Sequence, residues 1–209
     1  MSARPCAATL QGAGRIGPNA ITRMAEALMA SEGMAATRVL FAEAGLTPHL
    51  ATPPTTMVPE RDVMQLHRTL RAGLGEARAG LVSREAGRLT AYYLLAHRIP
   101  RPVQWLLRRL PPGPAAWILL RAIGRHAWTF AGSGRFRVLP GRPLRLEIVE
   151  GPLALGAQAE NPVCAYYAAT FETLFAELVS PRTRVTEVAC MALGAPACVF
   201  EVDWSCDSD

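Results

Sequence analysis

The chain has 209 residues, of which 50% are hydrophobic and 19% charged, and its formal net charge is +5. This composition is typical of a globular protein and excludes a disordered or collagen-like chain. No uncharged apolar run reaches the roughly 20 residues of a membrane-spanning helix, and the N-terminal segment lacks the apolar core of a signal peptide, so we expect a cytoplasmic protein.

The first half of the chain is predicted to be helical. Apolar residues recur at helical spacing within residues 18–31, 60–74 and 83–97. Ser83 is a residue type that caps helix N-termini, and we expect the third helix to begin there. Residues 47–59 are rich in Thr and Pro and are predicted to form the loop between the first two helices.

In the second half the apolar period changes to two. Residues 132–139 and 142–150 are predicted to be half-buried strands of a hairpin. Asn161 and Pro162 are typical of a helix start, as N-cap and first helical residue, and residues 183–193 and 197–204 predict a second hairpin.

The order β-β-α-β-β predicts an antiparallel sheet and an α+β fold, because hairpins join antiparallel strands. We expect the N-terminal helical region to pack on this sheet. Residues 1–58 would form a helical segment with a Pro-rich loop and residues 59–209 the main domain, together as one compact unit.

Gly12, Gly14 and Gly17 match the G-x-G-x-x-G pattern of dinucleotide-binding folds. That fingerprint requires a buried strand before the first glycine and an acidic residue at the end of a second strand about 20 residues later. Neither is predicted here, so we expect no intrinsic NAD(P) site. The alternative is that this segment is a flexible lead to the first helix.

Four of the five cysteines fall within residues 164–209, which makes this segment the strongest chemical signal in the sequence. If the second hairpin turns at Gly194, Cys190 and Cys198 face each other with Cβ atoms about 5 Å apart. This geometry suits a disulfide or a shared metal ion, and a reducing cytoplasm favours the metal. The alternative is that buried cysteines serve only as small hydrophobic residues.

Two further ligands would complete a tetrahedral site. Cys164 is predicted to lie in the first turn of its helix, where the helix dipole lowers the pKa of a thiol. Glu187 could supply an oxygen, but only if a bulge turns its side chain to the face that carries Cys190.

The pattern Cys164, Glu187-x-x-Cys190, a Gly194 turn and Cys198-Val-Phe resembles the 4-vinyl-reductase domain family, over roughly residues 81–204. This domain occurs in phenol-sensing transcriptional regulators and in a protein of bacteriochlorophyll biosynthesis described as a 4-vinyl (8-vinyl) reductase. The opening residues "GRIGPNAI" and the chain length resemble the latter. The resemblance implies that Cys164, Glu187, Cys190 and Cys198 bind a structural zinc ion.

The resemblance also implies a tetrapyrrole ligand. Such a ligand needs flat apolar surface, a side chain that can coordinate Mg, and cations for its carboxylates. Two segments combine these properties, and their candidate ligand-binding residues are Tyr92, Tyr93 and His97, and Arg125, His126, Trp128 and Phe130. The alternative is that these aromatic side chains belong to the core.

We expect a carrier or accessory factor that binds a Mg-porphyrin or chlorophyllide and works with pathway enzymes, because the chain shows no nucleotide, flavin or iron–sulfur signature. The alternative is an oxidoreductase that reduces the 8-vinyl group of a chlorophyllide with an external reductant. Nucleic-acid binding is not expected, because the arginines are scattered among acidic residues. Contact with the cytoplasmic face of the photosynthetic membrane and a homodimer are both left open.

Overall fold

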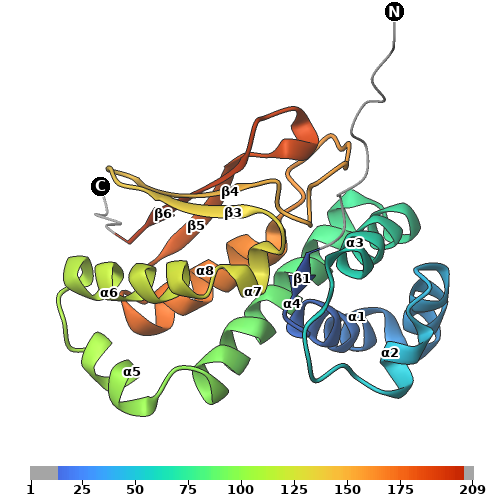
Figure 1. Cartoon of the computed structure of the whole chain (residues 1–209), viewed down its shortest axis with the longest axis horizontal. Helices are drawn as coiled ribbons and strands as arrows, with labels where there is room; N and C mark the ends of the chain where they lie inside the picture. The colour runs from blue at the N-terminus through green and yellow to red at the C-terminus, as the bar shows by residue number, and fades with distance from the viewer. Residues whose placement is uncertain (1–13, 205–209) are drawn as a thin grey trace, which may run out of the picture.

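The computed structural model describes residues 14–204 (Figure 1). The helices are α1 (Asn19–Glu43), α2 (Thr47–Ala51), α3 (Glu60–Leu74), α4 (Glu76–His97), α5 (Arg101–Leu107), α6 (Pro112–Arg125), α7 (Trp128–Ala131) and α8 (Ala165–Leu178). The strands are β1 (Arg15–Ile16), β2 (Val58–Pro59), β3 (Arg135–Leu139), β4 (Leu144–Val149), β5 (Arg184–Ala189) and β6 (Cys198–Asp203), with a short 3₁₀ helix η1 (Met191–Leu193) before β6. Cys6, Gly12 and Cys206 lie outside the described residues.

Strands β3 to β6 form an antiparallel sheet in the order β3-β4-β6-β5, which confirms the predicted α+β class. Its two faces follow the period-two pattern of the sequence. Leu144 and Leu146 of β4 are buried, whereas Arg145 between them is exposed and pairs with Glu201 across the strands. One face of the sheet is therefore apolar and the other carries charges.

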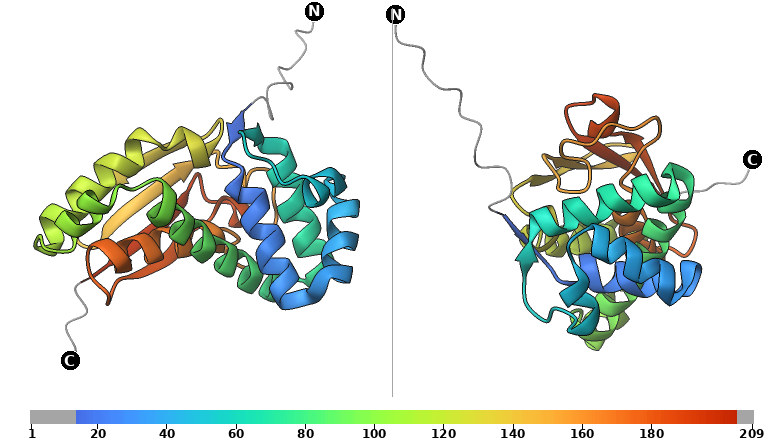
Figure 2. Two further views of the ribbon diagram at one scale, coloured as in Figure 1. Left: turned by 90° about the horizontal axis from the view of Figure 1, so that it is seen from below. Right: turned by 90° about the vertical axis from the view of Figure 1, so that its right-hand side faces the viewer.

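Helix α8 covers the apolar face of the sheet, and α4 packs along the other side of α8 (Figures 1 and 2). The two helices come unusually close at Gly87, where an added Cβ would lie 2.2 Å from the carbonyl oxygen of Tyr166. Helices α1 and α3 then pack on α4. The N-terminal helices thus reach the sheet through α4 and α8, and α8 is buried on two sides.

Several predicted boundaries were wrong. Helix α1 continues to Glu43 through a kink at Gly33, and α2 occupies part of the predicted loop. Helix α4 begins at Glu76, so Ser83 is a buried residue inside it and caps nothing. Helix α8 begins at Ala165, because residues 161–164 make contacts outside the helix, among them two hydrogen bonds from Asn161 to Glu76.

From Gly14 onward, the glycine-rich segment is held in place before α1. Residues Arg15–Ile16 pair with Val58–Pro59, and the buried carboxylate of Glu60 accepts hydrogen bonds from the Gly14 N–H and from the N–H and Oγ of Ser133. A Cβ on Gly14 would lie 2.3 Å from Glu60 Oε2. Gly14 is therefore required for a contact between backbone and carboxylate.

Buried residues from both sides of residue 58 join in one hydrophobic cluster, which includes Met24, Leu66 and Phe175. We propose that the helical segment and the main domain fold as one unit. Among the described residues, no helix combines the length and apolar character needed to cross a membrane.

His67 of α3 is a buried histidine whose Nε2 has no hydrogen-bond partner. Its ring meets the edge of Tyr166, and Arg71 lies one turn further along the helix. Burial, together with the Arg71 charge, lowers the pKa of His67 to about 3. The folded protein therefore keeps this imidazole neutral in mildly acidic solution.

This histidine should make the protein acid-sensitive. The unfolded chain binds a proton at His67 below about pH 6.5, whereas the folded chain does not, so stability present above that pH is lost as the pH falls. As the pH falls from 7 to 5, this site should lower the free energy of unfolding by about 2 kcal/mol. In denaturant unfolding, the free energy of unfolding of His67→Gln should fall by about 2 kcal/mol less between pH 7 and 5 than that of the wild type. His126→Gln, at an exposed histidine, should lose as much stability over this range as the wild type does. Equal losses in all three proteins would contradict this expectation.

Candidate metal centre

Four side chains converge beside the sheet: Cys164, Glu187, Cys190 and Cys198, whose ligand atoms all lie within 4.8 Å of one another. Cys164 immediately precedes α8, Glu187 belongs to β5, Cys190 lies between β5 and η1, and Cys198 begins β6. The structure thus brings together all four residues that the sequence predicts as ligands.

A register shift in the sheet places Glu187 on the same side as the cysteines. Glu187 pairs with Phe200, whereas Ala189 pairs with Val199, so an irregularity lies between the two residues of β5. This is the bulge that Glu187 needs in order to face the same side as Cys190. The pairing of Ala189 with Val199 also brings Cys190, the next residue, opposite Cys198, as predicted from a turn at Gly194.

The distances suit a metal ion better than a disulfide. The Sγ atoms of Cys164 and Cys198 are 3.4 Å apart, and those of Cys198 and Cys190 are 3.9 Å apart. A disulfide requires about 2.05 Å, and all three cysteines are free. Zinc–thiolate bonds of about 2.3 Å in a tetrahedron place the sulfurs about 3.8 Å apart, close to both observed values.

The carboxylate of Glu187 also fits a metal ligand. Its Oε2 accepts a hydrogen bond of 2.8 Å from the N–H of Cys164, while its Oε1 is buried and has no hydrogen-bond partner. A buried oxygen without a partner is costly unless a cation or a donor satisfies it. A metal ion among the sulfurs would satisfy it.

Without a cation, the four acidic groups compete for a small number of protons. Burial raises the pKa of Glu187 to about 8. Hydrogen bonds from Cys164 and Cys198 lower the pKa of the Cys190 thiol. In contrast, hydrogen bonds with Cys190 and Cys198, together with burial, raise the pKa of Cys164 well above its usual range. The pKa of Cys164 thus moves opposite to the direction predicted from its place at the helix start, because the neighbouring thiols and burial raise it.

Three sulfurs and one carboxylate would fill all the positions of a tetrahedral zinc ion. A closed set of ligands leaves no open position for substrate, which is typical of structural rather than catalytic zinc. The ion would join the start of α8 to the β5–β6 hairpin. We propose zinc as the metal, on the basis of this donor set.

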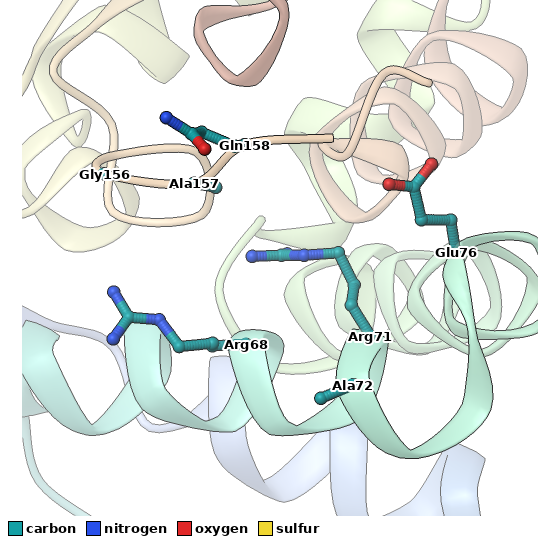
Figure 3. Close-up of a pocket in the computed structure, with 7 residues that line it drawn as sticks. All are labelled: Arg68, Arg71, Ala72, Glu76, Gly156, Ala157 and Gln158. Atoms are coloured by element: carbon teal, nitrogen blue, oxygen red, sulfur yellow. The ribbon is translucent and has the colours of Figure 1, made fainter. Parts of the chain in front are cut away.

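A cavity of about 440 Å³ lies between α3, the first residue of α4 and the loop of residues 156–158 (Figure 3). Arg68 and Arg71 extend from α3 toward this loop. Burial lowers the pKa of Arg71, while the nearby Cys164 and Cys190 act in the opposite direction. Arg71 would therefore offset part of the negative charge of a zinc ion with four anionic ligands. The sequence did not reveal this residue, because nothing in the local pattern of α3 indicates its proximity to Cys164 and Cys190, which follow 93 and 119 residues later.

The seven predicted pigment-binding residues form two groups. Tyr92, Tyr93 and His97 lie at the C-terminal end of α4, where the Tyr93 and His97 rings are 4.7 Å apart and Arg88 lies over Tyr92. Tyr92 is exposed, as is His97. The imidazole of His97 and the phenol of Tyr92 are therefore accessible from solvent, whereas Tyr93 is half-buried beneath the guanidinium of Arg23.

The second group follows α6. Arg125, His126 and Trp128 are exposed, whereas Phe130 is half-buried and contacts the rings of Phe136, Tyr167 and Phe171. Within the described part of the chain, no ring contact or hydrogen bond joins this group to the first. Neither group lines the cavity between α3 and residues 156–158.

Comparison with known proteins agrees with the cysteine pattern. The family model for the V4R domain matches residues 144–203, which include β4, α8, β5 and β6 and all four candidate ligands. The chain is 47% identical over 188 residues to the bacteriochlorophyll synthase 23 kDa chain of Cereibacter sphaeroides, with 90% of each chain covered. The chain belongs to the V4R-domain family. The corresponding protein of Rhodobacter capsulatus is 41% identical over 186 residues, covering 89% of this chain and 85% of its own length.

A solved structure also resembles this V4R-domain protein. It comes from a study of haem distortion in the H-NOX family and superposes with a TM-score of 0.56, covering 91% of this chain and 95% of its own. At 12% sequence identity, the similarity concerns the fold alone. It extends the shared architecture beyond the V4R domain, to the N-terminal helices.

Proposed function

We propose that this protein is an accessory factor of bacteriochlorophyll biosynthesis that binds a Mg-porphyrin or chlorophyllide and presents it to pathway enzymes. The observation that carries the proposal is the 47% identity, along nine-tenths of both chains, to a protein named as a chain of bacteriochlorophyll synthase. The proposal places the protein at the cytoplasmic face of the photosynthetic membrane.

The exposed aromatic groups on α4 and after α6 support pigment binding. Tyr92 is 40% exposed and Trp128 is 59% exposed, so each offers ring surface to a flat macrocycle without any rearrangement of the core. His97 and His126 offer imidazole nitrogens to Mg, and Arg125 offers a cation to a carboxylate. In this proposal the metal centre supports the fold and takes no part in pigment chemistry.

Titration with Mg-protoporphyrin or divinyl chlorophyllide tests the proposal. Micromolar pigment should shift the Soret band and quench tryptophan fluorescence. The Tyr92→Ser/Trp128→Ser variant should bind at least about tenfold more weakly, because it loses two stacking surfaces. Met34→Ser, at an exposed residue of α1, is the control and should bind normally. A wild-type protein that leaves the spectrum unchanged would refute pigment binding.

The same mixture distinguishes a carrier from an 8-vinyl reductase. With NADPH or reduced ferredoxin present, a carrier returns pigment of unchanged mass, whereas reduction of the vinyl group adds two hydrogen atoms. Mass spectrometry of the recovered pigment therefore decides between them.

A further inference from the structure

The charges of this protein are strongly segregated along the chain. Residues 86–146 are 61 residues with 11 arginines and no aspartate or glutamate, while the rest of the chain holds 11 arginines and all 17 acidic residues. This basic stretch contains α5, α6 and α7 entirely. The modest net charge of +5 therefore combines a strongly basic segment with an acidic remainder.

Helices α5 and α6 also expose large apolar side chains. Trp105 is 56% exposed and Trp117 is 63% exposed, and Val103 and Leu106 of α5 are exposed as well. Among the residues of α5, only Leu107 is buried. The fold therefore does not require the apolar character of these exposed positions.

The two helices repeat one pairing. A tryptophan of each helix is followed four residues later by an arginine whose guanidinium lies over the ring, at 4.0 Å for Arg109, just after α5, on Trp105 and at 5.6 Å for Arg121 on Trp117. Neither arginine forms an ion pair with an acidic residue in the described part of the chain. Each pair therefore presents apolar surface and an uncompensated positive charge together.

These features lie at one end of the molecule. Helices α5 and α6 are neighbours, and Figure 1 and the left view of Figure 2 place them at the opposite end from α1, α2 and α3. We define the α5–α6 surface by its exposed apolar and basic residues: Arg101, Val103, Trp105, Leu106, Arg109, Trp117 and Arg121.

We propose that the α5–α6 surface binds the surface of a bilayer that contains anionic lipids. Tryptophan prefers the headgroup region, arginine is attracted to anionic lipids, and exposed Val and Leu gain by entering the acyl boundary. A nucleic acid would satisfy the arginines but not these aliphatic side chains. This inference rests on the proposed function and specifies how the protein would reach the membrane. The candidate pigment-binding residues Arg125 and Trp128 belong to the same basic stretch, residues 86–146.

Flotation of the full-length protein with lipid vesicles tests this binding. We expect binding to phosphatidylcholine vesicles that contain phosphatidylglycerol, weaker binding to pure phosphatidylcholine, and release by salt. Removal of one arginine near such a surface costs about fivefold in partitioning. We therefore expect partitioning to anionic vesicles to fall at least about tenfold in each of two double variants, Arg109→Gln/Arg121→Gln and Trp105→Ser/Trp117→Ser.

Matched controls separate the surface from general effects. Arg38→Gln/Arg61→Gln removes the same charge elsewhere, and Val39→Ser/Leu81→Ser removes exposed apolar residues from α1 and α4. Both controls should bind vesicles as the wild type does, and thermal melts of all variants should show folded protein.

Three results would overturn the inference: no binding to anionic vesicles, equal loss in the surface and control variants, or a surface that binds RNA but not vesicles. The vesicle assay contains no pigment and the pigment titration contains no lipid. Failure of membrane binding can therefore be told apart from failure of pigment binding.

Discussion

A Cys198→Ser variant is expected to lose its metal ion and to unfold at a much lower temperature than the wild type. Cys198 Sγ lies 3.4 Å from Cys164 Sγ and 3.9 Å from Cys190 Sγ. A hydroxyl is a poor zinc ligand, and the loss would leave buried acidic groups without their cation. We expect at least about a 100-fold lower metal affinity and a destabilisation of at least about 3 kcal/mol.

Elemental analysis and calorimetry of purified protein measure this effect. The wild type should carry about one zinc ion per chain, and chelation should lower its melting temperature nearly to that of the variant. Cys6→Ser should retain the ion and the wild-type melting temperature. A metal-free wild type that is as stable as the metal-loaded protein would rule out a structural site.

Replacement of Glu60 by alanine should destabilise the fold nearly as much. The carboxylate is fully buried and accepts hydrogen bonds from Gly14 N–H at 3.2 Å and from Ser133 N–H and Oγ at 2.7 Å each. Its loss would leave these donors unpaired and separate the N-terminal strand from the turn after α7. Hydrogen bonds to charged groups contribute about 1.5–3 kcal/mol each but are not additive, so we expect a loss of about 3 kcal/mol or more.

Denaturant unfolding of three variants tests this role. Glu60→Gln keeps one acceptor oxygen and should have an intermediate effect. Glu43→Ala removes an exposed carboxylate and should change the stability by less than about 0.5 kcal/mol. If Glu60→Ala unfolded at the same denaturant concentration as Glu43→Ala, the carboxylate would have no anchoring role.

The C-terminal half of the fold was predictable from short-range patterns. Alternation in Leu144, Leu146 and Ile148 indicates a strand with one buried face, and these residues are buried in β4. The start of α8 was not predictable in this way. Asn161 and Pro162 have the local preferences of a helix start, but the carboxylate of Glu76, 85 residues earlier, holds Asn161 outside the helix.

Cys190 and Cys198 could be predicted to face each other because they belong to one hairpin, whose register follows from its turn. Glu187 joins them only through the bulge between Glu187 and Ala189, so the full set of four ligands rested on the family resemblance. The role of Gly14 could not be predicted, because it depends on a carboxylate 46 residues away. The unpartnered Nε2 of His67 could not be predicted from the sequence either. Its position on α3 indicates partial burial, but its complete burial depends on residues far away in the sequence, among them Tyr166 of α8.

The strand order has a consequence for the sequence of events during synthesis. Strand β6 lies between β4 and β5, so β4 can pair only with β3 until residues 198–203 have left the ribosome. Cys198 emerges with that strand. The nascent chain therefore can neither complete its sheet nor close its metal centre until this segment appears, and we expect both steps to occur together.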